Sequence, residues 1–162
     1  MRTILFLSIC TALLLQAGCG GDHGRPADLP RLFPVSITIT QENQPLEGAT
    51  VTVVSKTPSK YGTSSGTTNA SGTVTLRTYG FNGVPAGEYA VMVTRVGDEN
   101  QRESLTPEGE TVMVGGQAFN YVDVQFSDES TTPLSLTVTE RGARETFEVG
   151  APVRIFLGNN PG

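Results

Sequence analysis

Apolar and polar residues alternate along much of the chain from position 34 onward. Between positions 34 and 41 every second residue is apolar, namely Val35, Ile37 and Ile39. A period of two predicts a half-buried strand, because successive side chains of a strand point to opposite faces. The same period recurs in 46–56, 73–79, 88–96, 119–126 and 134–140. These segments are therefore predicted strands, with Val74 and Leu76 and then Tyr89, Val91 and Val93 facing inward.

Shorter apolar runs at 111–114, 145–149 and 153–157 predict further strands, and 134–140 is expected to pair with 145–149 around the Arg141-Gly142 turn. Polar or glycine-rich stretches predict loops at 57–71, 80–87, 97–109 and 127–133, with room for a short helical turn in 97–109. No stretch keeps a helical period over three turns. The pattern predicts an all-β, antiparallel β-sandwich of about seven to nine strands. A closed barrel is the alternative and would need more regular hairpins.

The first residues form a different kind of segment. Arg2 is followed by an apolar run from Ile4 to Leu15. That run is too short to cross a bilayer as a helix, which needs about 20 apolar residues. A short basic start, an apolar run and small residues are typical of a secretory signal peptide, here residues 1–18.

The segment Ala17-Gly18-Cys19 resembles the bacterial lipobox, with Gln16 where the usual pattern has Leu. The resemblance implies cleavage before Cys19 and a diacylglycerol on its thiol. The alternative is an ordinary secreted protein cleaved after Ala17 or Gly18. Cleavage removes Cys10 and leaves Cys19 without a partner, and acylation would protect this lone thiol in an oxidising compartment. Gly20 is not Asp, which favours the outer membrane if the organism is Gram-negative.

Residues 19–33 are predicted to be the lipidated cysteine and a flexible tether, because they are rich in Gly and Pro and show no periodicity. His23, the one histidine, lies in this segment and is expected to be solvated. The folded domain is expected at 34–157, followed by a short C-terminal tail at 158–162.

Three segments carry a family resemblance: Pro45 to Val53 (PLEGATVTV), Gly66 to Leu76 (GTTNASGTVTL) and Val84 to Val93 (VPAGEYAVMV). In this order and spacing they resemble the carboxypeptidase regulatory-like domains of bacterial lipoproteins. The resemblance covers roughly residues 35–149 and implies a transthyretin-like (prealbumin-like), or Ig-like, sandwich. Gly48 is expected to permit close backbone approach, and Gly72 to adopt a positive φ in a turn.

Composition then excludes several functions. The net charge of −5 argues against nucleic-acid binding through a basic surface. One histidine and two cysteines leave no Ser-His-Asp triad, Cys-His dyad or His- or Cys-ligated zinc site in the mature chain. The transthyretin-like hydroxyisourate hydrolases use histidines and a C-terminal Tyr-Arg-Gly-Ser that this chain lacks, and no P-loop is present. We expect no enzyme activity, no catalytic or metal site and no cofactor.

Weaker candidates remain among loop residues. Acids that are close in sequence, Asp98 with Glu99, Glu108 with Glu110, and Asp128 with Glu129, could serve glycoside chemistry. Asp98, Glu99, Asp123, Asp128 and Glu129 could supply oxygens to a structural calcium. Both sets are expected to be solvated turn acids, and Lys56 and Lys60 to be solvated loop charges. Tyr61, Tyr79 and Phe81 could stack on a sugar, although Tyr79 and Phe81 are rather expected to close one end of the core.

The leading expectation is a lipid-anchored cell-envelope protein with a non-enzymatic binding or structural sandwich. Its partners would be membrane lipid through Cys19 and an envelope protein or glycan. The alternative is a cell-surface carbohydrate- or peptide-binding module.

Overall fold

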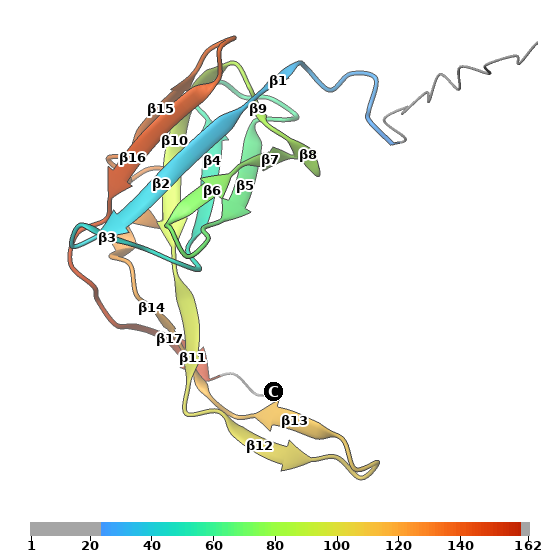
Figure 1. Ribbon diagram of the computed structural model, residues 1–162, viewed down its shortest axis with the longest axis vertical. Coiled ribbons are helices and arrows are strands. Elements are labelled where there is room, and N and C mark those ends of the chain that lie inside the picture. Colours follow the sequence, from blue (N-terminus) through green and yellow to red (C-terminus); the bar gives the residue numbers. More distant parts are fainter. Residues whose placement is uncertain (1–23, 160–162) are drawn as a thin grey trace, which may run out of the picture.

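A computed structural model describes residues 24–159, and these form an all-β structure of several sheets, most of them antiparallel (Figure 1). The helical element of this range is one 3-10 turn, η1 (Val124–Phe126), where the sequence predicted the end of a strand. Nothing helical between residues 24 and 159 is long and apolar enough to cross a membrane. The predicted signal peptide, Cys10, Cys19 and His23 lie outside the described residues.

One sheet has six strands in the order β15-β10-β4-β5-β7-β8, all paired antiparallel. Its strands are β15 (Ser135–Val138), β10 (Gly87–Thr94), β4 (Thr50–Ser55), β5 (Thr63–Thr67), β7 (Arg77–Thr78) and β8 (Phe81–Asn82). A second sheet faces it and is built around β2 (Val35–Gln41). Strand β2 pairs with β16 (Ala143–Glu148), β6 (Thr73–Thr75) and β3 (Gln44–Pro45).

The core lies between these two sheets. Ile37 and Ile39 of β2 and Val51 and Val53 of β4 are fully buried in one apolar cluster. The inward positions predicted for 73–79 and 88–96 are confirmed, since Val74, Leu76, Tyr89, Val91 and Val93 are all buried. Burial of such side chains stabilises the fold by about 1.5–3 kcal/mol each.

One predicted pairing and one predicted strand differ from the structure. Strand β16 runs parallel to β2, with Ala143 beside Val35 and Phe147 beside Ile39. It is therefore not an antiparallel partner of β15, and the Arg141-Gly142 turn instead carries the chain from one sheet to the other. The predicted strand 73–79 is two short strands that belong to different sheets, because β6 pairs with β2 whereas β7 pairs with β5. Leu76 lies between them and is fully buried.

The sequence prediction missed strand β5, which lies in a segment predicted to be a loop. The strand contains only Thr, Ser and Gly, so it shows no apolar alternation. It is held by close packing: a Cβ on Gly66 would lie 2.6 Å from Val74 Cγ2 and 2.7 Å from the Thr75 carbonyl oxygen. Its buried Ser64 hydroxyl lies 2.7 Å from the Thr78 hydroxyl. A polar strand is stable here because its small side chains fit and its buried hydroxyl is satisfied.

An arm projects from the two-sheet body (Figure 1) and consists of β11 to β14 and β17. Its strands are β11 (Val96–Glu99), β12 (Arg102–Leu105), β13 (Thr111–Val114), β14 (Gln117–Asn120) and β17 (Ile155–Asn159). They form a three-stranded sheet, β11-β14-β17, and a two-stranded one, β12-β13. The loop predicted at 97–109 is therefore largely strand.

The N-terminal residues of the described range contact the body. Strand β1 (Leu32–Phe33) pairs with β9 (Val84–Pro85), at the end of the body away from the arm (Figure 1). Leu29 is only 7% exposed, and Asp28 accepts hydrogen bonds from Lys60 Nζ (2.8 Å) and Tyr61 Oη (2.7 Å). The tether predicted to reach residue 33 is thus docked from about residue 28. Lys60 is exposed, as expected of a solvated loop charge, but it is paired with Asp28.

Candidate functional site

The outward side of the second sheet carries a regular set of hydroxyl groups. Because Val35, Ile37 and Ile39 point into the core, the residues between them point outward. Strand register continues this row onto the neighbouring strands, since Ser36 lies beside Arg144 on β16 and Thr75 on β6. We call this surface the hydroxyl face; its members are Ser36, Thr38, Thr40, Thr73, Thr75 and Thr146.

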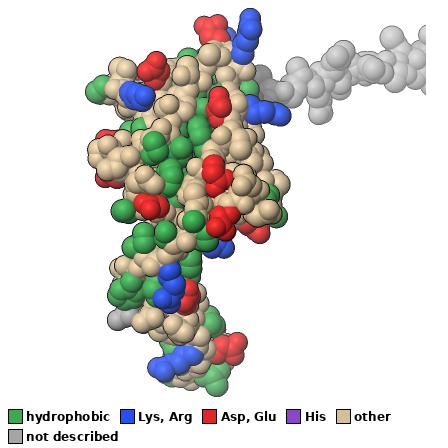
Figure 2. All heavy atoms as spheres, turned by 90° about the vertical axis from the view of Figure 1, so that its left-hand side faces the viewer, with side chains coloured by type: hydrophobic (Ala, Val, Ile, Leu, Met, Phe, Trp, Pro, Cys, Tyr) green, Lys and Arg blue, Asp and Glu red, His purple; other side chains and the backbone are tan. Residues whose placement is uncertain are grey.

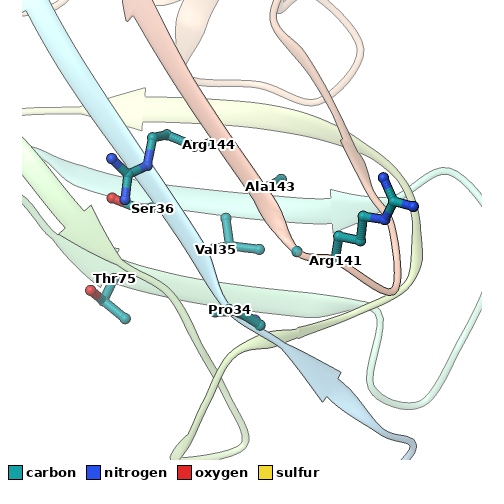
Figure 3. Close-up of a pocket in the computed structure, with 8 residues that line it drawn as sticks. Pro34, Val35, Ser36, Thr75, Arg141, Ala143 and Arg144 are labelled. Atoms are coloured by element: carbon teal, nitrogen blue, oxygen red, sulfur yellow. The ribbon is translucent and has the colours of Figure 1, made fainter.

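A hollow of about 380 Å³ lies at one end of the hydroxyl face. It is lined by Ser36 and Thr75, by Pro34 and Val35, and by the segment 141–144. Figure 3 shows the Arg144 side chain extending across β2 to lie near Ser36, while Arg141 rises from the turn on the other side and points away. A guanidinium beside hydroxyl groups is suited to hold an oxyanion.

The opposite end of the hydroxyl face carries the carboxylate of Glu148. It accepts hydrogen bonds from the backbone N–H groups of Glu42 (2.8 Å), Asn43 (3.1 Å) and Gly150 (3.1 Å). This carboxylate is engaged with its own end of the sheet and not with the arginines.

A second surface feature is the ring of Tyr79, which is 70% exposed. The expectation that Tyr79 closes the core is wrong. Its backbone has φ 51°, an unusual conformation for a non-glycine residue, and its ring meets the Tyr61 ring edge-on at 5.8 Å. Tyr61 is buried and Phe81 is partly buried, so of the three predicted aromatics Tyr79 offers the accessible face.

Apolar side chains gather on the arm. Most of the large hydrophobic residues that are exposed in residues 24–159 belong to it: Val96, Leu105, Val112, Met113, Phe156 and Leu157. Figure 2 shows hydrophobic side chains on this part of the molecule as well as along the middle of the body. Among residues 24–159 no other strand pairs with the hairpin β12-β13, so both of its edges keep unpaired backbone groups.

The predicted acidic candidates are scattered among structural roles. Glu99 is bound by Arg154 and Tyr121, Asp123 caps η1 through the Gln125 N–H, and Asp128 accepts from the Ser130 N–H. The hydrogen bond from Ser130 lowers the pKa of Asp128. Among residues 24–159, no group of three or more His, Cys, Asp or Glu side chains is placed to hold a metal ion. The calcium alternative and the carboxylate-pair alternative gain no support from this geometry.

Sequence reasoning did not single out the hydroxyl face or its arginines as a site. The signal was nevertheless present, since Ser36, Thr38 and Thr40 were expected to share one side of a strand. What the sequence did not reveal is that β16, and with it Arg144, lies next to them. That neighbour follows from the parallel pairing of β16 with β2.

Comparisons with known proteins leave the family open. No family model matches the chain, and no curated protein matches it. Among solved structures, a 9R-lipoxygenase from Cyanothece PCC8801 is similar at 14% identity with a TM-score of 0.27. The match covers 74% of this chain but only 16% of the lipoxygenase, and a likeness of this size carries no argument about fold or activity.

Proposed function

We propose that this chain is a lipid-anchored, non-enzymatic protein of the bacterial cell envelope, in which Cys19 carries the lipid and the β-domain binds or supports another envelope component. The observation that carries the proposal is the run Ala17-Gly18-Cys19 directly after an apolar segment. The docked chain from Asp28 onward supports it, because the β-domain follows Cys19 after only a short stretch. Two or three acyl chains would give firm anchoring, whereas one would give only reversible binding.

We further propose that the two facing sheets form a transthyretin-like or Ig-like sandwich of the carboxypeptidase regulatory-like type, preceded by a signal peptide at 1–18. Support comes from the core shared by both sheets and from Gly72, which has the positive φ expected of its turn. Gly48 also has a positive φ, but no atom lies near its missing Cβ. Conformation, and not the close approach that we expected, therefore explains that glycine.

The absence of enzyme activity is part of the same proposal. The sequence holds one histidine and two cysteines, which leaves no common nucleophile–base pair in the mature chain. Three of the acids that could have replaced them, Glu99, Asp123 and Asp128, are engaged with Arg154 and Tyr121, with the backbone of Gln125 and with Ser130.

The test is the intact mass of the protein extracted from its native membranes, together with incorporation of radiolabelled palmitate. We expect residues 19–162 plus diacylglycerol, with or without a third acyl chain, and loss of both label and membrane association in Cys19→Ala. An unmodified mass, or a Cys19→Ala variant that stays in the membrane fraction, would overturn the anchor.

A second candidate function is that of a cell-surface carbohydrate-binding module, and the exposed ring of Tyr79 favours it. A sugar can stack on an accessible aromatic face, and a non-glycine residue held at positive φ is a feature that function can retain at a cost in stability. A glycan array should then show binding that Tyr79→Ala abolishes and Phe156→Ala, an exposed aromatic on the arm, leaves unchanged. An array at background for the full chain would remove this candidate.

A further inference from the structure

We propose that the hollow at the Arg144 end of the hydroxyl face is a binding site for an oxyanion, the carboxylate or phosphate group of a small ligand. This inference goes beyond the proposed function and does not depend on the lipid at Cys19. It rests on three observations: cations without partners, hydroxyl donors without partners, and the lack of a carboxylate in the hollow.

Most basic side chains between residues 24 and 159 have a partner: Arg25, Arg31, Lys60, Arg77, Arg95 and Arg154 each make an ion pair, a hydrogen bond or a contact with an aromatic ring. Within this range, the basic side chains with no such interaction are Lys56, Arg102, Arg141 and Arg144. Both Arg141 and Arg144 line the hollow. In a chain with a net charge of −5, unpaired arginines on one small surface are a local exception.

Ser36 lies directly between Arg144 and Thr75 in the strand register, so the three side chains form one outward row. Neither the Ser36 nor the Thr75 hydroxyl makes a hydrogen bond to any residue in the described part of the chain. Both are therefore available to donate to a bound oxygen. An oxyanion near Ser36 would receive hydrogen bonds from hydroxyls and from a guanidinium, which presents its donors in a planar fork.

None of the residues lining the hollow is Asp or Glu. Glu148 shares the outward side of β16 but is two strand positions beyond Thr146 and is held by backbone N–H groups. Glu145 follows Arg144 directly and is exposed, but its register beside Ile37 places it on the other side of β16 from Arg144. No carboxylate on the hydroxyl face therefore competes with a ligand for Arg144.

The geometry assigns different roles to the two arginines. Arg144 lies near Ser36 and is the direct ligand of the oxyanion, whereas Arg141 stands at the far rim of the hollow (Figure 3). A volume of about 380 Å³ suits a small ligand or one charged sugar ring. Carboxylate and phosphate share the chemistry that a guanidinium recognises, so the experiment must separate them.

The experiment is isothermal titration of the full chain in a neutral detergent with three probes: inorganic phosphate, glucuronate and glucose. We expect saturable binding of phosphate, glucuronate or both, weakened by added salt, and no binding of glucose at the same concentrations. Glucuronate alone would identify a carboxylate ligand, and phosphate alone a phosphate ligand. The absence of saturable binding by either anion would overturn the proposal.

Matched variants locate the site. Arg144→Gln should weaken binding by about tenfold or more, since it removes a charge-assisted hydrogen bond, and Arg141→Gln should weaken it less. Arg102→Gln makes the same charge change at an unpaired arginine on the arm and should have no effect. Equal losses in Arg144→Gln and Arg102→Gln would show general charge attraction and overturn the site. In the unmutated chain, whichever anion binds in the titration should slow the reaction of Arg144 with phenylglyoxal but not that of Arg102. If that anion left the reaction rate of Arg144 unchanged, the proposal would be contradicted independently of any variant.

Discussion

Glu99 and Arg154 lie 55 positions apart in the chain and meet through two hydrogen bonds, from Nε to Oε1 (3.2 Å) and from Nη2 to Oε2 (2.7 Å). Tyr121 donates its hydroxyl to the same carboxylate, and the Arg154 guanidinium lies 3.7 Å from the Phe119 ring centroid. These contacts join β11, β14, the segment after β14 and the residue just before β17. They hold the base of the arm together where few residues are buried.

This cluster predicts a pH dependence for the arm. The hydrogen bonds from Arg154 and then Tyr121 lower the pKa of Glu99 from 4.5 to about 2. A carboxylate with a lowered pKa stabilises the fold above its ordinary pKa, so the contribution is complete above about pH 4.5 and is lost as the pH falls toward 2. In Glu99→Gln, the stability of the arm should depend much less on pH in the acidic range. Unfolding curves recorded at near-neutral and at acidic pH, compared between the variant and the unmutated chain, measure this. Glu103→Gln, on the neighbouring strand β12, is the control and should keep the pH dependence.

Gly66 should not tolerate a side chain. A Cβ at this position would lie 2.6 Å from Val74 Cγ2 and 2.7 Å from a backbone oxygen, which cannot easily move. We expect Gly66→Ala to lower the free energy of unfolding by about 1–3 kcal/mol, as overpacking does. Chemical denaturation measures it. Ser65→Ala, at the exposed next position, should change stability by less than about 0.5 kcal/mol, and equal effects at both positions would contradict the packing argument.

The docked N-terminal segment makes a separate prediction. Leu29 is 7% exposed, and strand β1, which follows it, pairs with β9 of the body. Leu29→Ala should cost about 1–2 kcal/mol of apolar burial and release the segment locally. Trypsin should then cut after Arg31 faster than in the unmutated chain. Leu105→Ala, at an arm position that is 72% exposed, should leave the rate unchanged.

The arm should open before the body. Its hairpin β12-β13 has only two strands and exposes Leu105 and Met113, and an isolated hairpin is marginally stable in water. Amide hydrogen exchange should therefore be faster in β12 and β13 than in β4 and β10, which are central in their sheet. Protection in the hairpin equal to that of β4 would show that another surface covers it in solution.

The alternation of apolar residues was sufficient to predict the strands that face the core, as Ile37, Val51 and Val91 illustrate. It was not sufficient for β5, because Ser64 fits through its hydrogen bond and Gly66 through its small size, and neither is hydrophobic. Nor could it predict which strands pair. Register with β2 is set by long-range contacts, and a local pattern is the same for a parallel and an antiparallel neighbour.

The candidate site depends on that same information. The sequence shows Ser36 and Thr75 as outward residues of separate strands, and Arg144 as one charge among several near a turn. Only the pairing of β2 with β6 on one side and with β16 on the other places the three in a row. For Tyr79 the sequence offered a sugar-stacking role but not its exposure, since an aromatic at the end of an apolar alternation favours burial. In the structure its backbone has φ 51° and its ring is 70% exposed.

The crossing of the chain at Leu76 has a mechanical consequence. Strands β6 and β7 follow each other without a loop, yet β6 belongs to one sheet and β7 to the other. A force that slides one sheet over the other must therefore first pull β6 from β2 or β7 from β5, because the backbone joins these strands at a fully buried residue. The two sheets should separate only after this connection has lost its hydrogen bonds.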